Sequence, residues 1–165
     1  MIDPCVLPQE FSKTFMAKVQ LASILPQVIS AAQNSRLKQV LQQHSHQTNL
    51  QVDRLETGAQ QLDITLQAWG CTSVQELICD LHLVMQTQPP SPWRDAMLAN
   101  KLRLINQYMT VVYAKIKDYA RPLRNPYLMD LLHLNQQEEE NTETQLAIIV
   151  LRDLVVSPSK HYHYT

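Results

Sequence analysis

The side chains of this sequence that could do chemistry lie where helical spacing predicts burial. Extending the apolar positions of each expected helix through its centre puts six polar residues on the core-facing side: Lys18, His44, Thr48, Asn135, Glu139 and Thr142. A bundle keeps buried polar groups when they pair with one another, bind a ligand or lie nearer the edge of the core. Imidazole and carboxylate are metal ligands, and an ammonium beside a carboxylate is an ion pair. The sequence therefore offers a choice between a metal site and an organic ion pair.

A dimetal carboxylate centre makes specific demands on a four-helix bundle. Two helices each supply an inward Glu, and each of the other two supplies an acid and a second ligand one turn later. The middle of the first three long helices contains no Asp or Glu, and the central acids are confined to the last helix: Glu138, Glu139, Glu140 and Glu143. One acidic helix has too few negative oxygens to offset two divalent ions and their lost hydration. We therefore expect no working di-iron centre.

An ion pair is the first interpretation of the central residues. Lys18 is predicted to donate to Glu139 or Glu138, with His44, Thr48 and Gln51 supplying the remaining hydrogen bonds. In that arrangement an organic cation takes the place of metal charge.

A remodelled metal site is the alternative. Its ligands come from His44, His46, Glu138 and Glu139, because imidazole and carboxylate together suit one zinc or iron ion. The metal content of the purified protein separates the two interpretations.

These residues must be positioned by long helices. The apolar spacing predicts helices over about 8–33, 35–57, 93–120 and 126–156, a shorter helix over 74–86, and a polar tail over 157–165. Pro26 falls inside the first helix and predicts a kink. Ser35 is expected to cap the second helix and Gly58 to help end it, while Ser73-x-x-Glu76 has the spacing of a capping box.

Four long amphipathic helices with one long crossover are typical of the ferritin-like antiparallel four-helix bundle. The crossover joins the second and third long helices and contains the shorter helix. At 165 residues the chain fits one domain with a sizeable core. The sequence therefore predicts a single all-α domain spanning residues 1–165.

Composition excludes several classes of function. The formal net charge is −1, so no overall field attracts nucleic acid or an anionic membrane, and no apolar run is long enough to cross a membrane. The three cysteines form no CxxC motif or disulfide framework, and no basic-then-apolar leader is evident, which favours the cytoplasm. A conventional enzyme is not expected, because no phosphate-binding loop, nucleophile elbow or catalytic triad pattern occurs. We name no catalytic or cofactor-binding residue.

Several short sequence patterns point to one known family. They are AKVQL at 17–21 with Leu25-Pro26, HSHQTNLQ at 44–51 with Asp53-Arg54, Cys71 with Leu77-Ile78, NQYM at 106–109, and EEENTE at 138–143. In these patterns the chain resembles the YciE/YciF-like ferritin-like family of stress-associated bacterial proteins, in one register from about Met16 to Leu154. The resemblance implies an antiparallel bundle that is commonly dimeric.

The resemblance also implies where the family's metal site has changed. The family's acid in the first helix corresponds to Lys18, two glutamates of the second correspond to His46 and Gln47, and two acids of the third correspond to Asn106 and Met109. The last helix keeps its acids. The positions of the degenerate site are Lys18, His46, Gln47, Gln51, Asn106, Met109, Glu138, Glu139 and Glu143.

The sequence thus favours a non-enzymatic bundle without a metal or other cofactor, acting through self-association or a protein partner in a stress setting. A homodimer is the expected assembly, and exposed Trp69 or Trp93 is a candidate for its surface. The pair of histidines in the tail, His161 and His163, is expected to be an ordinary polar chain end.

Overall fold

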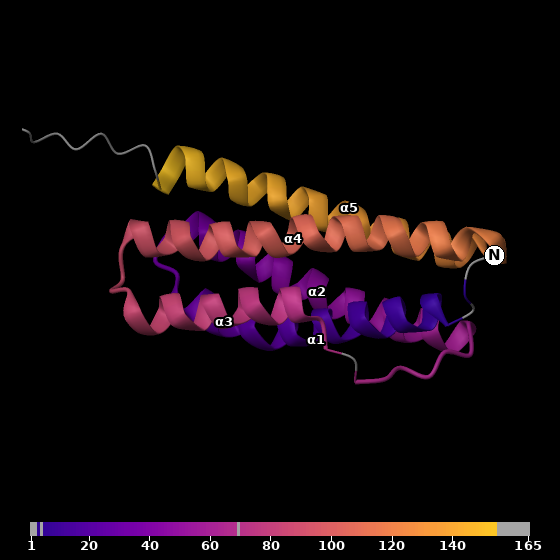
Figure 1. Ribbon diagram of the computed structural model, residues 1–165. Coiled ribbons are helices and arrows are strands. Elements are labelled where there is room, and N and C mark those ends of the chain that lie inside the picture. The colour runs from indigo at the N-terminus through magenta and orange to yellow at the C-terminus, as the bar shows by residue number, and fades with distance from the viewer. Residues whose placement is uncertain (1–2, 4, 69, 155–165) are drawn as a thin grey trace, which may run out of the picture.

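The protein is a bundle of helices in the computed structural model, which describes residues 3, 5–68 and 70–154 (Figure 1). The five α-helices are α1 (Val6–Ala31), α2 (Ser35–Gln61), α3 (Thr72–Thr87), α4 (Pro92–Ala120) and α5 (Pro126–Ile149). A 3-10 turn (Arg121–Leu123) joins α4 to α5, and a π-helical turn (Val150–Leu154) follows α5. The tail from residue 155 onward and Trp69 lie outside the described residues.

Helices α1, α2, α4 and α5 make the bundle, and α3 lies in the crossover. Neighbours in sequence pack as the pairs α1–α2 and α4–α5, while α2 also contacts α5 and α1 contacts α4. Helix α3 lies between α2 and α4 in the chain and packs on α4 and α1 (Figure 1). This is the ferritin-like four-helix bundle with a helix-containing crossover that the sequence predicts. Within the described ranges, no helix has the length and apolarity needed to span a membrane.

The predicted core positions of α1 need a correction. In the sequence, five apolar residues of this helix recur at helical spacing and are predicted to face the core: Phe11, Phe15, Ala22, Leu25 and Ile29. Phe11 and Leu25 are fully buried, whereas Phe15, Ala22 and Ile29 are only half-buried. The residues that fill the core along this helix are instead Leu21, Ile24 and Val28, together with Ala17 and Lys18. Helix α1 continues through Pro26 to Ala31. It packs against α2, α3 and α4, so its buried positions follow contacts on several sides rather than one narrow stripe.

Helix α2 starts at residue 35 as predicted but is capped one residue earlier than expected, and α3 starts two residues before the predicted position 74. Asn34, not Ser35, caps α2, because its side-chain oxygen accepts a hydrogen bond from the Leu37 amide at 2.9 Å. Helix α3 begins at Thr72 and is preceded by Cys71 without a side-chain cap, so the Ser73-x-x-Glu76 box does not form. The predicted start of α5 at residue 126 is confirmed. Pro126 is its first residue, and the Asn125 side-chain oxygen caps the helix by accepting from the Leu128 amide at 3.1 Å.

Gly58 does not end α2, which continues to Gln61. A β-carbon at this position would lie 3.0 Å from Phe11 Cζ and 3.4 Å from Leu128 Cδ1. Phe11 and Leu128 are both fully buried, so neither has free space to move into. Gly58 therefore lets α1 and α5 approach α2 closely. The sequence alone does not predict this role, because a glycine near the expected end of a helix is read as its end.

The turn between α1 and α2 is clamped by the first turn of α4. Both carboxylate oxygens of buried Asp95 accept from the Gln33 amide at 3.1 and 3.0 Å, and Oδ2 also accepts from the Asn34 amide at 2.7 Å. Arg94 donates to the carbonyl oxygens of Ala31 and Gln88. These bonds satisfy backbone groups at the end of α1 that its own helix leaves unpaired, and they fix how the two helical pairs meet.

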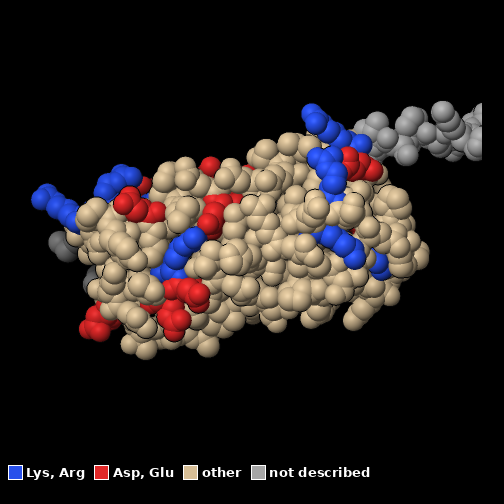
Figure 2. All heavy atoms as spheres, turned by 180° about the vertical axis from the view of Figure 1, so that it is seen from behind, with Lys and Arg blue, Asp and Glu red and all other residues tan. Residues whose placement is uncertain are grey.

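Charged side chains are sparse on one face of the bundle. Figure 2 shows the face opposite to that of Figure 1, where positive and negative side chains lie in mixed groups separated by wide uncharged areas. Part of this pattern is visible in α2, which contains no Lys, Arg, Asp or Glu between Lys38 and Asp53.

Candidate functional site

The centre of the bundle contains an ion pair between α1 and α5. The Lys18 ammonium donates to Glu139 Oε1, and both side chains are fully buried. Burial raises the pKa of the Glu139 carboxyl, while the Lys18 charge acts in the opposite direction. The pair predicted from helical spacing is thus formed with Glu139, the fully buried one of its two predicted partners.

His44 and Thr48 of α2 lie in the same core but do not complete the pair by hydrogen bonds. Within the described chain, His44 Nε2, Thr48 Oγ1 and Glu139 Oε2 are buried without a hydrogen-bond partner. Burial, and then the nearby Lys18 charge, lowers the pKa of His44 from 6.5 to about 3. His44 is therefore neutral at physiological pH, and the expectation that His44 and Thr48 supply hydrogen bonds to the pair is wrong.

Beside the pair, five side chains of α2, α4 and α5 close a ring of hydrogen bonds. Glu138 Oε2 accepts from Gln51 Nε2 at 3.0 Å and from Arg54 Nη1 at 2.8 Å. The same Arg54 nitrogen donates to Asn135 Oδ1 at 3.0 Å. Asn135 Nδ2 donates to the Tyr113 hydroxyl at 3.4 Å, and that hydroxyl donates to Gln51 Oε1 at 3.1 Å.

Gln51 belongs to this ring and also acts on the pair, since hydrogen bonding from its side chain opposes the rise in the pKa of the Glu139 carboxyl. The ring gives Glu138 a cation of its own. Arg54 holds Glu138, while Lys18 holds Glu139. The two neighbouring carboxylates of α5 are thus each paired with a basic side chain from a different helix. Because two cations already neutralise them, these carboxylates are poor candidates to offset the charge of a divalent ion.

Tyr113 is the residue of the ring whose hydrogen bonds sequence reasoning missed. Its side chain is fully buried, and burial, followed by the Glu139 charge, raises the pKa of its hydroxyl well above 10. The hydroxyl therefore stays protonated and can donate to Gln51. A buried tyrosine usually finds a hydrogen-bond partner, but the spacing of Tyr113 in α4 predicts only packing.

Among the described residues, four further positions that the resemblance assigns to the changed metal site make no hydrogen bond to the pair: Gln47, Asn106, Met109 and Glu143. Met109 and Asn106 of α4 are buried, and both amide atoms of Asn106 lack a partner within the described residues. Glu143 accepts at the rim from Arg103 Nε at 2.9 Å and Gln107 Nε2 at 3.2 Å. Half-buried Gln47 accepts from the Thr142 hydroxyl at 3.4 Å.

The four residues of the alternative metal site do not all lie on the same side of their helices. His44 and Glu139 are buried and Glu138 is half-buried, whereas His46 is exposed on the outer side of α2. Among the described residues, no group of three or more His, Cys, Asp or Glu side chains lies close enough to hold a metal ion. The reason is geometric, because residues 44 and 46 of one helix point about 200° apart around its axis.

Comparisons with known proteins agree with this fold. Residues 6–154 match a family model described as a domain of unknown function (DUF892). Protein YciF of Escherichia coli (strain K12) is 22% identical over 144 residues, which are 87% of each chain. The crystal structure of that E. coli stress protein superposes with a TM-score of 0.84 and covers 89% of this chain and 93% of its own. YcfI, a putative structural protein from Rhodopseudomonas palustris, has a TM-score of 0.79 at 22% identity over 86% of this chain and 90% of its own.

Proposed function

This chain belongs to the DUF892 family, the YciE/YciF-like proteins, and from that premise we propose that it is a metal-free, non-enzymatic member acting through self-association in a stress setting. The observation that carries the metal-free part is the contact of Lys18 with Glu139 at the bundle centre. By the resemblance, Lys18 stands where relatives have a metal-binding acid. Its ammonium neutralises Glu139 without a metal.

The chemistry of the donors supports this proposal. A divalent ion at the centre would have to displace the ammonium of a fully buried lysine, and the displaced charge would then lie unpaired in the core. Arg54 similarly holds Glu138. The stress setting rests on the E. coli relative alone, which is described as a stress protein. The cytoplasm is the location that a bundle with three free cysteines favours.

Metal content is the test of the metal-free centre. Untagged protein expressed with added iron, manganese and zinc is expected to contain less than about 0.1 metal per chain after desalting, measured by mass spectrometry, because a site without enough anionic donors binds divalent ions poorly. Glu139→Gln is the matched variant, and it should contain no less metal than the wild-type protein. One or two ions per chain that Glu139→Gln abolishes would instead establish the remodelled His/Glu site.

Self-association is supported by an exposed apolar face of α4. Leu104, Tyr108 and Val111 recur at helical spacing and are 47%, 36% and 67% exposed, and Trp93 at the start of the same helix is 68% exposed. A line of large apolar side chains on the surface is uncommon in a monomer. We infer that two copies bury this face in a symmetric dimer.

Sedimentation tests that dimer. The wild-type protein is expected to sediment as a dimer at high micromolar concentration, and the double variant Leu104→Glu/Val111→Glu as a monomer, because opposed glutamates repel across a two-fold interface. Leu123→Glu is the control, since Leu123 is also exposed but lies in the turn after α4. A wild-type monomer, or a double variant that remains a dimer, contradicts the assignment of this face.

A further inference from the structure

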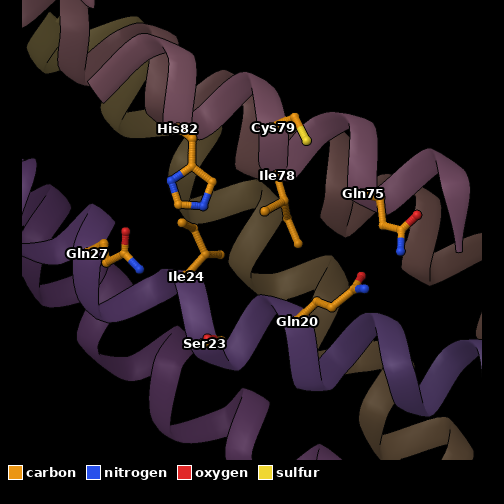
Figure 3. A pocket seen from close by; sticks show the side chains of 8 residues that line it. All are labelled: Gln20, Ser23, Ile24, Gln27, Gln75, Ile78, Cys79 and His82. Carbon is orange, nitrogen blue, oxygen red and sulfur yellow. The ribbon is translucent and has the colours of Figure 1, made fainter. Parts of the chain in front are cut away.

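A groove lies between α1 and the crossover helix α3, and neither residue of the central ion pair lines it. It has a volume of about 480 Å³ and is lined by Gln20, Ser23, Ile24, Gln27, Gln75, Ile78, Cys79 and His82 (Figure 3). Sites for small organic molecules typically have volumes of roughly 300–1,000 Å³. The groove is therefore large enough for a small molecule rather than only for water.

The lining is free of charge but rich in amides. Ile24 and Ile78 lie in the middle of the groove, with Gln20 and Gln75 at one end and Gln27 and His82 at the other (Figure 3). No Lys, Arg, Asp or Glu lines it. Each glutamine amide has two donors and one acceptor oxygen, so both ends of the groove can recognise a group that itself donates and accepts hydrogen bonds.

One of these amides is incompletely satisfied. The Gln20 side-chain oxygen is buried, yet it accepts no hydrogen bond within the described part of the chain. A buried acceptor without a donor is unfavourable, because it has lost its hydrogen bonds to water and gained none in return. When the Gln20 side chain turns toward the groove, an occupant that brings an N–H group to it removes that cost, which favours a ligand with donors over a purely apolar one.

We propose that the α1–α3 groove binds a small, uncharged cyclic amide, in which ring N–H and C=O groups alternate as they do in a nucleobase. The flat apolar faces of the ring contact Ile24 and Ile78, and its polar edges pair with the glutamine amides. This site is independent of the central Lys18–Glu139 pair and of the α4 face.

Other ligand classes fit the groove less well. An anion such as a phosphate or carboxylate finds no lysine or arginine in the lining. A metal ion finds Cys79 and His82 one helical turn apart on α3, but no third His, Cys, Asp or Glu side chain of the described residues joins them. Two protein ligands fall short of the three or four of ordinary zinc sites.

The test uses Cys79 as a reporter and Cys5 as a control in the same chain. Both thiols are free and exposed, but only Cys79 lines the groove. Uracil is the probe, and orotate, which is uracil with an added carboxylate, is the charged comparison. With uracil at saturation, the rate at which iodoacetamide alkylates Cys79 should fall at least about fivefold, because a bound ring blocks access to the thiol. The rate at Cys5 should not change.

Three variants assign the effect to the groove. Ile78→Trp fills the space and should abolish protection by uracil, and Ile78 is only half-buried at the edge of the core. Gln20→Leu should weaken uracil binding by about five- to tenfold through the lost hydrogen bond. Gln42→Leu, at an exposed glutamine of α2 that does not line the groove, should bind as the wild type does. Equal thermal unfolding of the three variants shows that each is folded.

The outcomes separate cleanly. Protection of Cys79 by uracil that Ile78→Trp removes and that orotate does not match supports the proposal. It is overturned if neither uracil nor the simple lactam 2-pyrrolidone protects Cys79, if protection persists in Ile78→Trp, or if orotate binds as tightly as uracil.

Discussion

Replacing Lys18 with methionine is expected to lower the free energy of unfolding by about 4 kcal/mol at pH 8, measured by urea denaturation. Methionine keeps the length and apolar body of the side chain but removes the ammonium that contacts Glu139. Glu139 is then a fully buried carboxylate without a cation, and leaving one partner of a buried pair alone costs much more than removing both.

Two variants distinguish the lost pair from ordinary loss of packing. In Lys18→Met/Glu139→Leu both charges are gone, and stability should return to within about 1 kcal/mol of the wild-type value or exceed it. Lys13→Met removes a lysine of the same helix that is 38% exposed and 3.7 Å from Glu10, and it should have no comparable effect. If the single and double variants are equally unstable, the ion pair is not the cause.

The deficit of Lys18→Met should also depend on pH. Burial already raises the pKa of Glu139, and the Lys18 charge opposes that rise. Without Lys18 the carboxyl therefore takes up a proton at a higher pH, and the neutral acid is cheaper to bury. The difference in unfolding free energy between wild type and variant should shrink from pH 8 to pH 5.

The bundle and its buried polar residues follow largely from helical spacing. Lys18, His44, Thr48, Asn135, Glu139 and Thr142 were each placed in the core by extending an apolar pattern, and all six are buried. The spacing works because every long helix here has one face toward the others. It is less accurate for Phe15 and Ile29, which are half-buried and pack against the edge of the core, because the contacts of α1 with α2, α3 and α4 place its fully buried positions elsewhere on the helix.

Contacts between helices far apart in sequence could not be predicted in the same way. The hydrogen bond between Gln51 and Tyr113 and the ion pair between Arg54 and Glu138 both depend on the axial position of α2 relative to α4 and α5. A shift of a few ångströms along the helix axis would change these partners. The clamp of Asp95 on the turn before α2 depends equally on how the crossover returns the chain. Periodicity gives the face of a residue, but it contains no information about axial offset between helices.

His44 is expected to make the bundle lose stability in mild acid. In the unfolded chain its imidazole takes up a proton near the ordinary pKa of 6.5, whereas burial and the Lys18 charge lower the pKa in the folded chain to about 3. Between these values the unfolded state binds more protons, so the free energy of unfolding falls as the pH falls. At about 1.4 kcal/mol for each unit of pKa, the loss is roughly 2 kcal/mol by pH 5 and on the order of 4 kcal/mol by pH 3.

Comparison with His44→Gln isolates this contribution from that of Glu139, whose raised pKa acts in the opposite direction by stabilising the fold as the carboxyl takes up a proton. Urea denaturation from pH 8 to pH 4 should show a slope in the wild type that is reduced in His44→Gln. His46→Gln removes an exposed histidine two residues away and should keep the wild-type slope. Equal slopes in wild type and His44→Gln would mean that the folded protein admits a proton to His44, and hence that the polar centre is open to water rather than sealed around Lys18 and Glu139.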